Sequence, residues 1–133
     1  MADPEDKIYA TITDLMVAMQ DSKLRFLSLR QPIQWDIIWH IEQAQMAELV
    51  VDITSIANAT NHSRNSIAKH VETLRENEFL ILEKDPKDSR RTLIVPTEKL
   101  RLELKNFTRS ISPFITEASF NIQREEWIKR SKN

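Results

Sequence analysis

Two short apolar runs, FLILE at residues 79–83 and TLIVP at residues 92–96, are separated by the polar segment KDPKDSRR. Their composition and the turn residues between them predict a β-hairpin. The chain contains no glycine, so other residues must build its turn. Asp85 and Pro86 serve this purpose, because proline is favoured at the second position of a type I turn. Turn chemistry does not account for the adjacent arginines Arg90 and Arg91 at the far end of the segment.

Apolar residues recur at three- and four-residue spacing on both sides of the hairpin, which is typical of amphipathic helices. The pattern predicts a long helix from Glu5 to about Arg30 and a second one from Pro32 to about Ala47. Further helices are expected over 52–60 and 63–77, and again after Pro96. We expect Pro113 to interrupt this final helical stretch, so that one or two long helices follow the hairpin. The order of elements predicts a mainly α fold with one small hairpin.

Residues 53–74 fit a helix–turn–helix. Asp52 or Thr54 is a plausible cap for the short first helix, Asn61 suits a left-handed turn, and Ser63 is a good N-cap for the second helix. The second helix would bury Ile67, Val71 and Leu74. Its other faces carry side chains suited to bases and phosphates. An ordinary solvated helix often carries the same polar residues, so the helix alone leaves both readings open.

A hairpin directly after such a helix makes a winged helix. A wing that carries Arg90 and Arg91 suits the narrow, electronegative minor groove of DNA. Asp88 lies two residues before Arg90 and can hold its guanidinium in a fixed orientation. The simpler alternative is that DPKD forms a turn and nothing more; it explains the aspartates and the proline but leaves the arginines unexplained.

Residues 52–99 resemble the DNA-binding core of MarR-type (multiple-antibiotic-resistance-regulator) transcription factors. The family's wing reads roughly Asp-Pro-x-Asp-x-Arg, an apolar strand, and Thr-Glu-Lys-Gly, which stands here as DPKDSRRTLIVPTEKL. The resemblance implies a winged helix–turn–helix in a single MarR-like domain over 1–133, with dimerisation helices at 1–31 and 98–133 around a DNA-binding core at 32–97. It also implies a recognition helix at 63–77 in the major groove and a wing at 84–92 in the minor groove. The expected DNA-binding residues are Ser63, Arg64, Asn65, Ser66, Lys69 and His70 on the helix, and Asp88, Arg90 and Arg91 on the wing.

Three positions depart from the family's pattern. A glycine common after the recognition helix is Glu78 here, and the glycine after Thr-Glu-Lys is Leu100. An apolar residue usual before the interhelical turn is Thr60. Because a left-handed glutamate would be strained, we expect either that Asn77 takes the left-handed role or that the helix ends differently. Leu100 should let the following helix begin without a flexible joint.

The terminal segments carry long apolar stripes that a monomer would leave exposed, which usually marks an interface. The residues expected to form a two-fold dimerisation layer are Ile8, Ile12, Leu15, Met19, Phe107, Ile111, Phe114, Ile115 and Phe120. Packing of the two termini within one chain is the alternative. The resemblance favours a homodimer, whose recognition helices would meet a pseudo-palindromic double-stranded DNA site about one helical turn apart.

The resemblance also implies a small-molecule effector, bound between the dimerisation helices and the winged helix. Trp35, Trp39, His40 and Met46 are candidates to line that cleft. Tryptophan and methionine on an amphipathic helix are more often core residues, and His40 is more often packed and hydrogen bonded than a ligand contact.

Several classes of protein are disfavoured. The chain has no cysteine, which excludes disulfides and thiolate metal sites, and its three histidines lack metal-ligand spacing. We find no phosphate-binding glycine loop or catalytic motif and expect no enzyme, no metal and no cofactor. No signal peptide or membrane-spanning run is visible, so a cytoplasmic protein is expected.

The leading hypothesis is a homodimeric, sequence-specific DNA-binding regulator. Its rival, kept open by a net charge of -1, is a winged-helix protein-interaction module without DNA binding.

Overall fold

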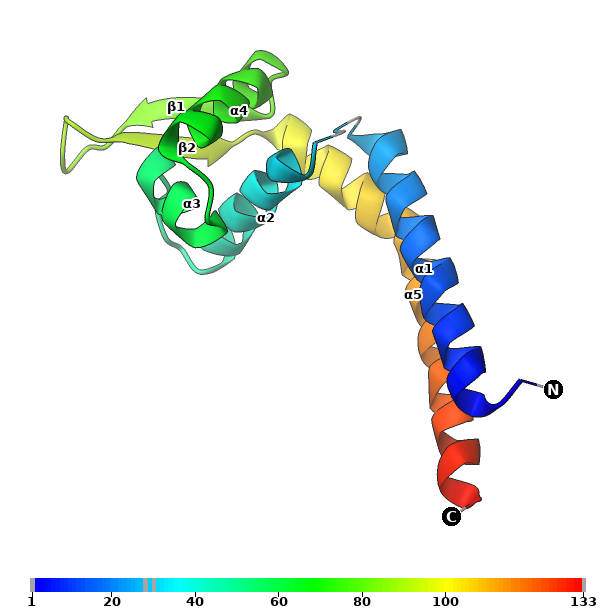
Figure 1. Cartoon of the computed structure of the whole chain (residues 1–133). Coiled ribbons are helices and arrows are strands. Elements are labelled where there is room, and N and C mark those ends of the chain that lie inside the picture. The colour runs from blue at the N-terminus through cyan, green and yellow to red at the C-terminus, as the bar shows by residue number, and fades with distance from the viewer. Residues whose placement is uncertain (1, 28, 30, 133) are drawn as a thin grey trace. The chain divides into compact units, whose positions relative to one another are not determined.

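The computed structural model describes residues 2–27, 29 and 31–132. Its elements in chain order are α1 (Pro4–Phe26), α2 (Pro32–Met46), α3 (Ile53–Thr60), α4 (Arg64–Glu76), β1 (Leu80–Lys84), β2 (Thr92–Pro96) and α5 (Glu98–Ser131) (Figure 1). The expected fold, mainly α with one β-hairpin, is confirmed. No helix among these residues is long and apolar enough to cross a membrane.

The chain divides into two compact units, one of residues 29–103 and one of residues 1–28 together with 104–133. We call the first the winged-helix unit and the second the helical unit, and each is described by itself. The expected domain layout placed its boundaries at 31/32 and 97/98, and it stays a prediction.

The winged-helix unit has a core drawn from all of its elements. The side chains exposed by 1% or less are Ile37, Ile38 and Ile41 of α2, Ile56 of α3, Ile67 and Leu74 of α4, Leu80 of β1 and Leu100 at the start of α5. Full burial of such a side chain contributes about 1.5–3 kcal/mol. The predicted inward face of α4 is confirmed, since Val71 is also buried. Leu100 is thus a core residue in the first turn of α5.

The two strands pair antiparallel, with Leu80 opposite Pro96 and Lys84 opposite Thr92. A third segment joins the hairpin: the backbone N–H of Ile94 donates to the carbonyl of Val51 over 2.8 Å. This bond attaches β2 to the chain directly before α3. Sequence reasoning did not anticipate it.

The helix–turn–helix forms as the local residues dictate. Asp52 caps α3, because its carboxylate accepts from the N–H of Ser55 at 2.8 Å. Asn61 adopts the expected left-handed conformation with φ of 60°. Ser63 caps α4 by accepting from the N–H of Ser66 at 3.1 Å. Thr60, the departure before the turn, satisfies its hydroxyl by donating to the carbonyl of Ile56 over 2.7 Å.

Glu78 corrects one expectation. It takes the left-handed conformation itself, with φ of 65°, while Asn77 stays at φ of -80°. The N–H of Phe79 donates to the carbonyl of Leu74, and the N–H of Glu78 donates to the carbonyl of Arg75. These two hydrogen bonds form a Schellman motif. Glu48 ends α2 in the same way with φ of 58°. Two carbonyl groups at each helix end gain donors, and this offsets the steric cost of a left-handed residue with a Cβ.

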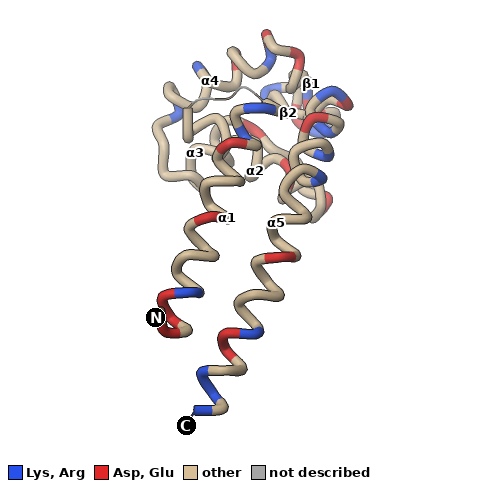
Figure 2. The backbone as a smooth tube through the Cα atoms, turned by 90° about the vertical axis from the view of Figure 1, so that its right-hand side faces the viewer, with Lys and Arg blue, Asp and Glu red and all other residues tan. Residues whose placement is uncertain are grey.

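The helical unit consists of α1 and the part of α5 from residue 104 onward, which run antiparallel (Figure 1). Figure 2 shows acidic residues at the start of α1 and basic residues at the end of α5. Lys129 and Glu5 join these two ends with an ion pair of 3.0 Å. A cavity of about 250 Å³ between the helices is lined by residues that include Leu15, Phe114 and Ala118. The two helices therefore contact each other without filling the space between them.

Two expected helix boundaries in this unit are wrong. The first helix ends at Phe26, capped by Leu27, rather than near Arg30, which lies outside the described residues. Pro113 does not interrupt α5, which continues from Glu98 to Ser131. Proline removes one backbone hydrogen bond, but the segment is solvent-exposed here, and the buried side chains of Ile111 and Ala118 hold the helix on either side.

The residues expected in the dimer layer fall into three classes. Phe107 and Ile111 are already buried within the chain, and Ile8, Leu15 and Met19 are half-buried. The exposed members are Ile12, Phe114, Ile115 and Phe120. Tyr9, Met16, Val17 and Trp127 add further exposed apolar area to the same two helices.

Candidate nucleic-acid interface

The exposed surface of α4 carries the first set of candidate residues. Arg64, Asn65, Ser66 and Lys69 are exposed, and Ser63 precedes them as the N-cap. Because Ile67, Val71 and Leu74 hold the opposite face in the core, these polar side chains point outward. Arginine, lysine and asparagine can donate to base-edge acceptors, and serine suits phosphate.

His70 differs from the other candidates on α4 because it is half-buried. Its Nδ1 lies 3.4 Å from Nε2 of Gln34, a buried residue of α2. Burial, and after it the positive charges of Lys69 and His62, lowers the pKa of His70 below its usual range. The neutral imidazole is therefore favoured at neutral pH, and a charge contact between His70 and phosphate would have to work against this environment.

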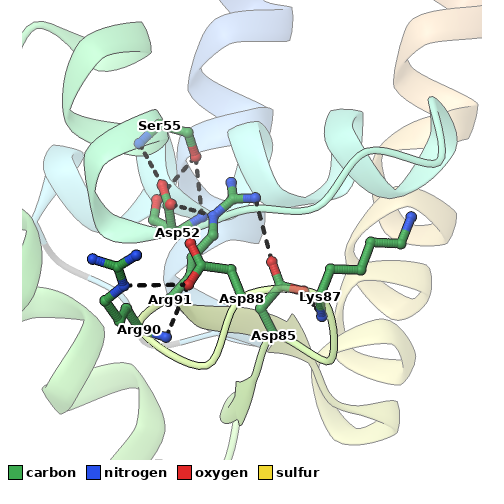
Figure 3. Close-up of polar contacts among 7 residues, drawn as sticks. All are labelled: Asp52, Ser55, Asp85, Lys87, Asp88, Arg90 and Arg91. Carbon is green, nitrogen blue, oxygen red and sulfur yellow. Dashed lines mark hydrogen bonds and ion pairs between the residues drawn. The ribbon is translucent and has the colours of Figure 1, made fainter.

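The wing loop is shaped by two aspartates (Figure 3). Asp85 accepts from the N–H of Lys87 at 2.8 Å across a bend at Pro86. The expected type I turn at Pro86 is wrong: the backbone-bonded turn lies over Asp88–Arg91, where the N–H of Arg91 donates to the carbonyl of Asp88 over 2.9 Å. Asp88 accepts from the N–H of Arg90 at 3.1 Å. Its carboxylate lies 3.9 Å from Nε of Arg90, so Asp88 holds the backbone of Arg90 more closely than its guanidinium. The side chain of Arg90 is 95% exposed.

Arg91 has a different environment from its neighbour. Its Nε donates to Oδ2 of Asp52 over 2.6 Å, and its Nη1 lies 3.7 Å from Oδ2 of Asp85 (Figure 3). Hydrogen bonding to Asp52 raises the pKa of Arg91, which stays charged. Burial by itself would raise the pKa of Asp52, but the hydrogen bonds from Ser55 and Arg91 outweigh it and lower this pKa. The second arginine of the pair thus has a partner within the chain.

A hollow of about 350 Å³ is lined by residues from the start of α3, from α4 and from the wing. Its lining residues are Asp52, Ile53, Thr54, Arg64, Asp88, Arg90, Arg91 and Thr92. Arg64 at the start of α4 and Arg90 on the wing therefore border one recess. The arrangement offers guanidinium groups from two elements to a single polyanionic partner.

Sequence reasoning missed Asp52 and Asp85 as partners of Arg91. Asp52 was a candidate helix cap, but nothing local connects it with an arginine 39 residues away.

Of the candidates for an effector cleft, Trp35 is buried and donates from Nε1 to the carbonyl of Leu29 over 3.2 Å. Trp39 and His40 are half-buried, and Met46 is 78% exposed. Within the described ranges no cluster of histidine, aspartate and glutamate has metal-binding geometry.

Comparison with solved structures shows the fold. RV1404 from Mycobacterium tuberculosis superposes with a TM-score of 0.76 at 12% identity, covering 96% of this chain and 86% of that one. The MepR–DNA complex of S. aureus has a TM-score of 0.73 at 18% identity, with 94% and 90% covered; MepR has also been solved bound to ethidium bromide. The transcriptional regulator Tm0710 from Thermotoga maritima has a TM-score of 0.67 at 18% identity, with 96% and 90% covered. Neither a protein-family model nor a curated protein sequence matches the chain.

The match extends over nearly the whole chain, including the helical unit, and the neighbours include a transcriptional regulator and a protein solved in complex with DNA. The fold implied by the sequence resemblance is therefore confirmed. At identities below one fifth, the likeness concerns the fold, and the DNA-contacting residues of this chain stay predictions.

Proposed function

We propose that this chain, which has the fold of MarR-type regulators, is a transcriptional regulator that binds double-stranded DNA as a homodimer. Helix α4 enters the major groove and offers Arg64, Asn65 and Lys69 to base edges. Ser63 and Ser66 lie at the phosphate backbone, and Arg90 enters the minor groove from the wing.

One observation carries the proposal: Arg90 projects from the wing loop with its side chain 95% exposed. Arg91, directly beside it, has two carboxylate partners within the chain. Among the residues that the structure describes, the guanidinium of Arg90 has only the long contact to Asp88. A fully solvated arginine whose backbone is held in place is suited to an external anion, and the recess that it shares with Arg64 points to a partner as large as a DNA backbone.

The homodimer is supported by the exposed apolar residues of the helical unit. Phe120 is 66% exposed and Trp127 is 65% exposed on α5. Apolar side chains of this size, together with those of α1, exceed what isolated surface residues contribute on a monomer. A second copy of the same two helices covers them by two-fold symmetry, and its α4 then reaches the neighbouring major groove.

A small-molecule effector completes the proposal. MepR, which has the same fold, has been solved both with DNA and with ethidium bromide, and this supports ligand control as part of the proposed function. The test is DNA release from the purified protein when candidate ligands are added, with the protein's unfolding temperature as a control for direct binding.

The first experiment selects bound duplexes from a random DNA pool and then compares wild type with Arg90→Ala on the selected duplex. We expect the substitution to weaken binding by about 1–3 kcal/mol and to lower the slope of log affinity against log salt by about one. Arg130→Ala, an exposed arginine on α5, is the matched control and should bind as wild type does.

The rival function, a protein-interaction module, makes the opposite prediction. It expects no enrichment of any duplex and no dependence on Arg90. Light scattering tests the dimer independently: at micromolar concentration the mass should be twice the chain mass of 15.6 kDa, and a monomer there contradicts the dimeric part of the proposal.

A further inference from the structure

We propose that Asp52 is a positioning residue for the wing: through Arg91 it locks the base of the hairpin onto the start of α3 and thereby sets where Arg90 is presented. The inference rests on the proposed function, because it assigns Asp52 and Arg91 a role in DNA binding without a contact of Asp52 with DNA.

Asp52 uses its two carboxylate oxygens for two different tasks. Oδ1 accepts from the N–H of Ser55 at 2.8 Å and caps α3. Oδ2 accepts from Nε of Arg91 at 2.6 Å. The side chains of Asp52 and Arg91 are 21% and 34% exposed, so the pair is partly shielded from solvent and is stronger than an open surface pair. One residue thus belongs to the helix–turn–helix and to the wing at once.

The hairpin has a second point of attachment directly beside the Asp52–Arg91 ion pair. The N–H of Ile94 in β2 donates to the carbonyl of Val51 over 2.8 Å. The hairpin is therefore bound to residues 51 and 52 by a backbone bond and by an ion pair. Two bonds at neighbouring points restrict the rotation that a single bond would allow.

From Arg91 the restraint reaches the loop of the wing. Arg91 extends a second contact of 3.7 Å to Asp85, and its carbonyl accepts from the N–H of Asp85 at 3.0 Å. Its own N–H donates to the carbonyl of Asp88 over 2.9 Å. Arg90 is covalently next to this fixed point, and Asp88 also accepts from its N–H. The backbone of Arg90 is thus held on both sides, while its side chain remains exposed.

The electrostatics make the inference testable. Asp52 and Asp88 both border the recess that Arg64 and Arg90 line. A carboxylate beside a polyanion should repel it, so removal of a carboxylate that has no other role should tighten DNA binding. If Asp52 positions the wing, its removal has the opposite effect.

The decisive variant is Asp52→Asn. Asparagine caps a helix about as well as aspartate, so α3 keeps its N-cap, whereas the amide cannot replace the charged acceptor of Arg91. The matched control is Glu83→Gln, which removes one exposed carboxylate from the same hairpin. On the duplex selected by wild type, we expect Asp52→Asn to bind about five- to tenfold more weakly. Glu83→Gln should bind equally well or more tightly.

A double variant separates positioning from a loss of general stability. If Asp52 acts by presenting Arg90, Asp52→Asn costs nothing further in an Arg90→Ala background. Equal losses in both backgrounds overturn the inference, and so does an Asp52→Asn protein that binds as Glu83→Gln does. Failure of wild type itself to select or bind any duplex is a different result and overturns the proposed function instead.

Hydrogen exchange tests, without DNA, whether the Asp52–Arg91 ion pair restrains the wing. In Asp52→Asn we expect exchange of the backbone amides of Arg90, Arg91 and Ile94 to speed up by a clearly larger factor than exchange of the amides of Ile67 and Val71 in α4, which rises only with the loss of overall stability. Unchanged exchange in the wing overturns the inference even if DNA binding is weakened.

Discussion

The winged-helix unit buries most of its apolar residues within one chain, with exceptions such as Met46 and Leu49, whereas the helical unit buries few of its own and leaves many in contact with solvent. Ile37, Ile56 and Ile67 are fully buried in the first unit. Phe120 and Trp127 are about two-thirds exposed in the second. The difference teaches that a core of three short helices and a hairpin closes on itself, but two long antiparallel helices cannot enclose their apolar faces.

The same contrast recurs on a smaller scale between two neighbouring arginines. Arg91 is held by the carboxylates of Asp52, the N-cap of α3, and of Asp85 in the wing loop, while Arg90 is almost fully exposed. In both cases one member is satisfied within the chain and the other remains exposed to solvent. The following predictions test this division, from the largest expected effect to the smallest.

The first prediction concerns the exposed face of the helical unit. Phe120→Glu places a charge in the proposed two-fold layer in both copies, and each copy also loses the burial of one phenylalanine. We expect association to weaken by about 4 kcal/mol or more, measured by sedimentation as a shift of the monomer–dimer equilibrium. Ser119→Glu, at the exposed neighbouring position, is the control. Dimers of unchanged strength in Phe120→Glu would place the interface elsewhere.

The second prediction concerns the closed core. Ile67→Ala removes a side chain of 0% exposure on α4 and should lower the free energy of unfolding by about 3 kcal/mol through lost burial and a residual cavity. Denaturant unfolding measures the loss. Ala68→Gly, on the same helix, should cost about 1 kcal/mol through helix propensity. A loss for Ile67→Ala no larger than that of Ala68→Gly would mean that this core is not closed.

The third prediction uses the lowered pKa of Asp52. A carboxyl group whose folded pKa lies below its unfolded pKa stabilises the folded state above the unfolded pKa, and this contribution disappears as the pH falls through the folded value. Wild type should therefore be more stable than Asp52→Asn by about 1 kcal/mol at neutral pH. The difference should shrink as the pH falls below about 4. Thermal unfolding across this range tests it, and a difference that grows toward acid pH would contradict the direction of the shift.

The fourth prediction concerns the left-handed glutamate after α4. Glu78→Gly relieves the steric cost of a Cβ at φ of 65° and should stabilise the protein by about 0.5–1 kcal/mol, after the greater backbone entropy of glycine in the unfolded chain is subtracted. Glu78→Ala is the control, because it loses the ion pair with Lys99 but keeps the Cβ. Equal effects of the two substitutions in thermal unfolding would show that the backbone is not strained there.

Much of the winged-helix unit was predictable because its signals are local. The left-handed Asn61, the Ser63 cap and the inward stripe of Ile67, Val71 and Leu74 each depend on neighbours within a few residues. The hairpin followed from two strand-forming runs and the turn residues between them. The exposed position of Arg90 also agrees with its predicted place on the wing.

The sequence by itself determined the order of elements, the Ser63 cap and the outward face of α4, since helix periodicity and turn chemistry act over one or two turns of chain. Only the tertiary structure decided that Asp52 and Arg91 meet across 39 residues, that Glu78 takes the left-handed turn, and that α5 continues through Pro113. Each of these depends on packing or hydrogen bonding that outweighs a local preference by about 1–3 kcal/mol. Local propensity alone cannot supply that energy, because it comes from residues that folding brings together.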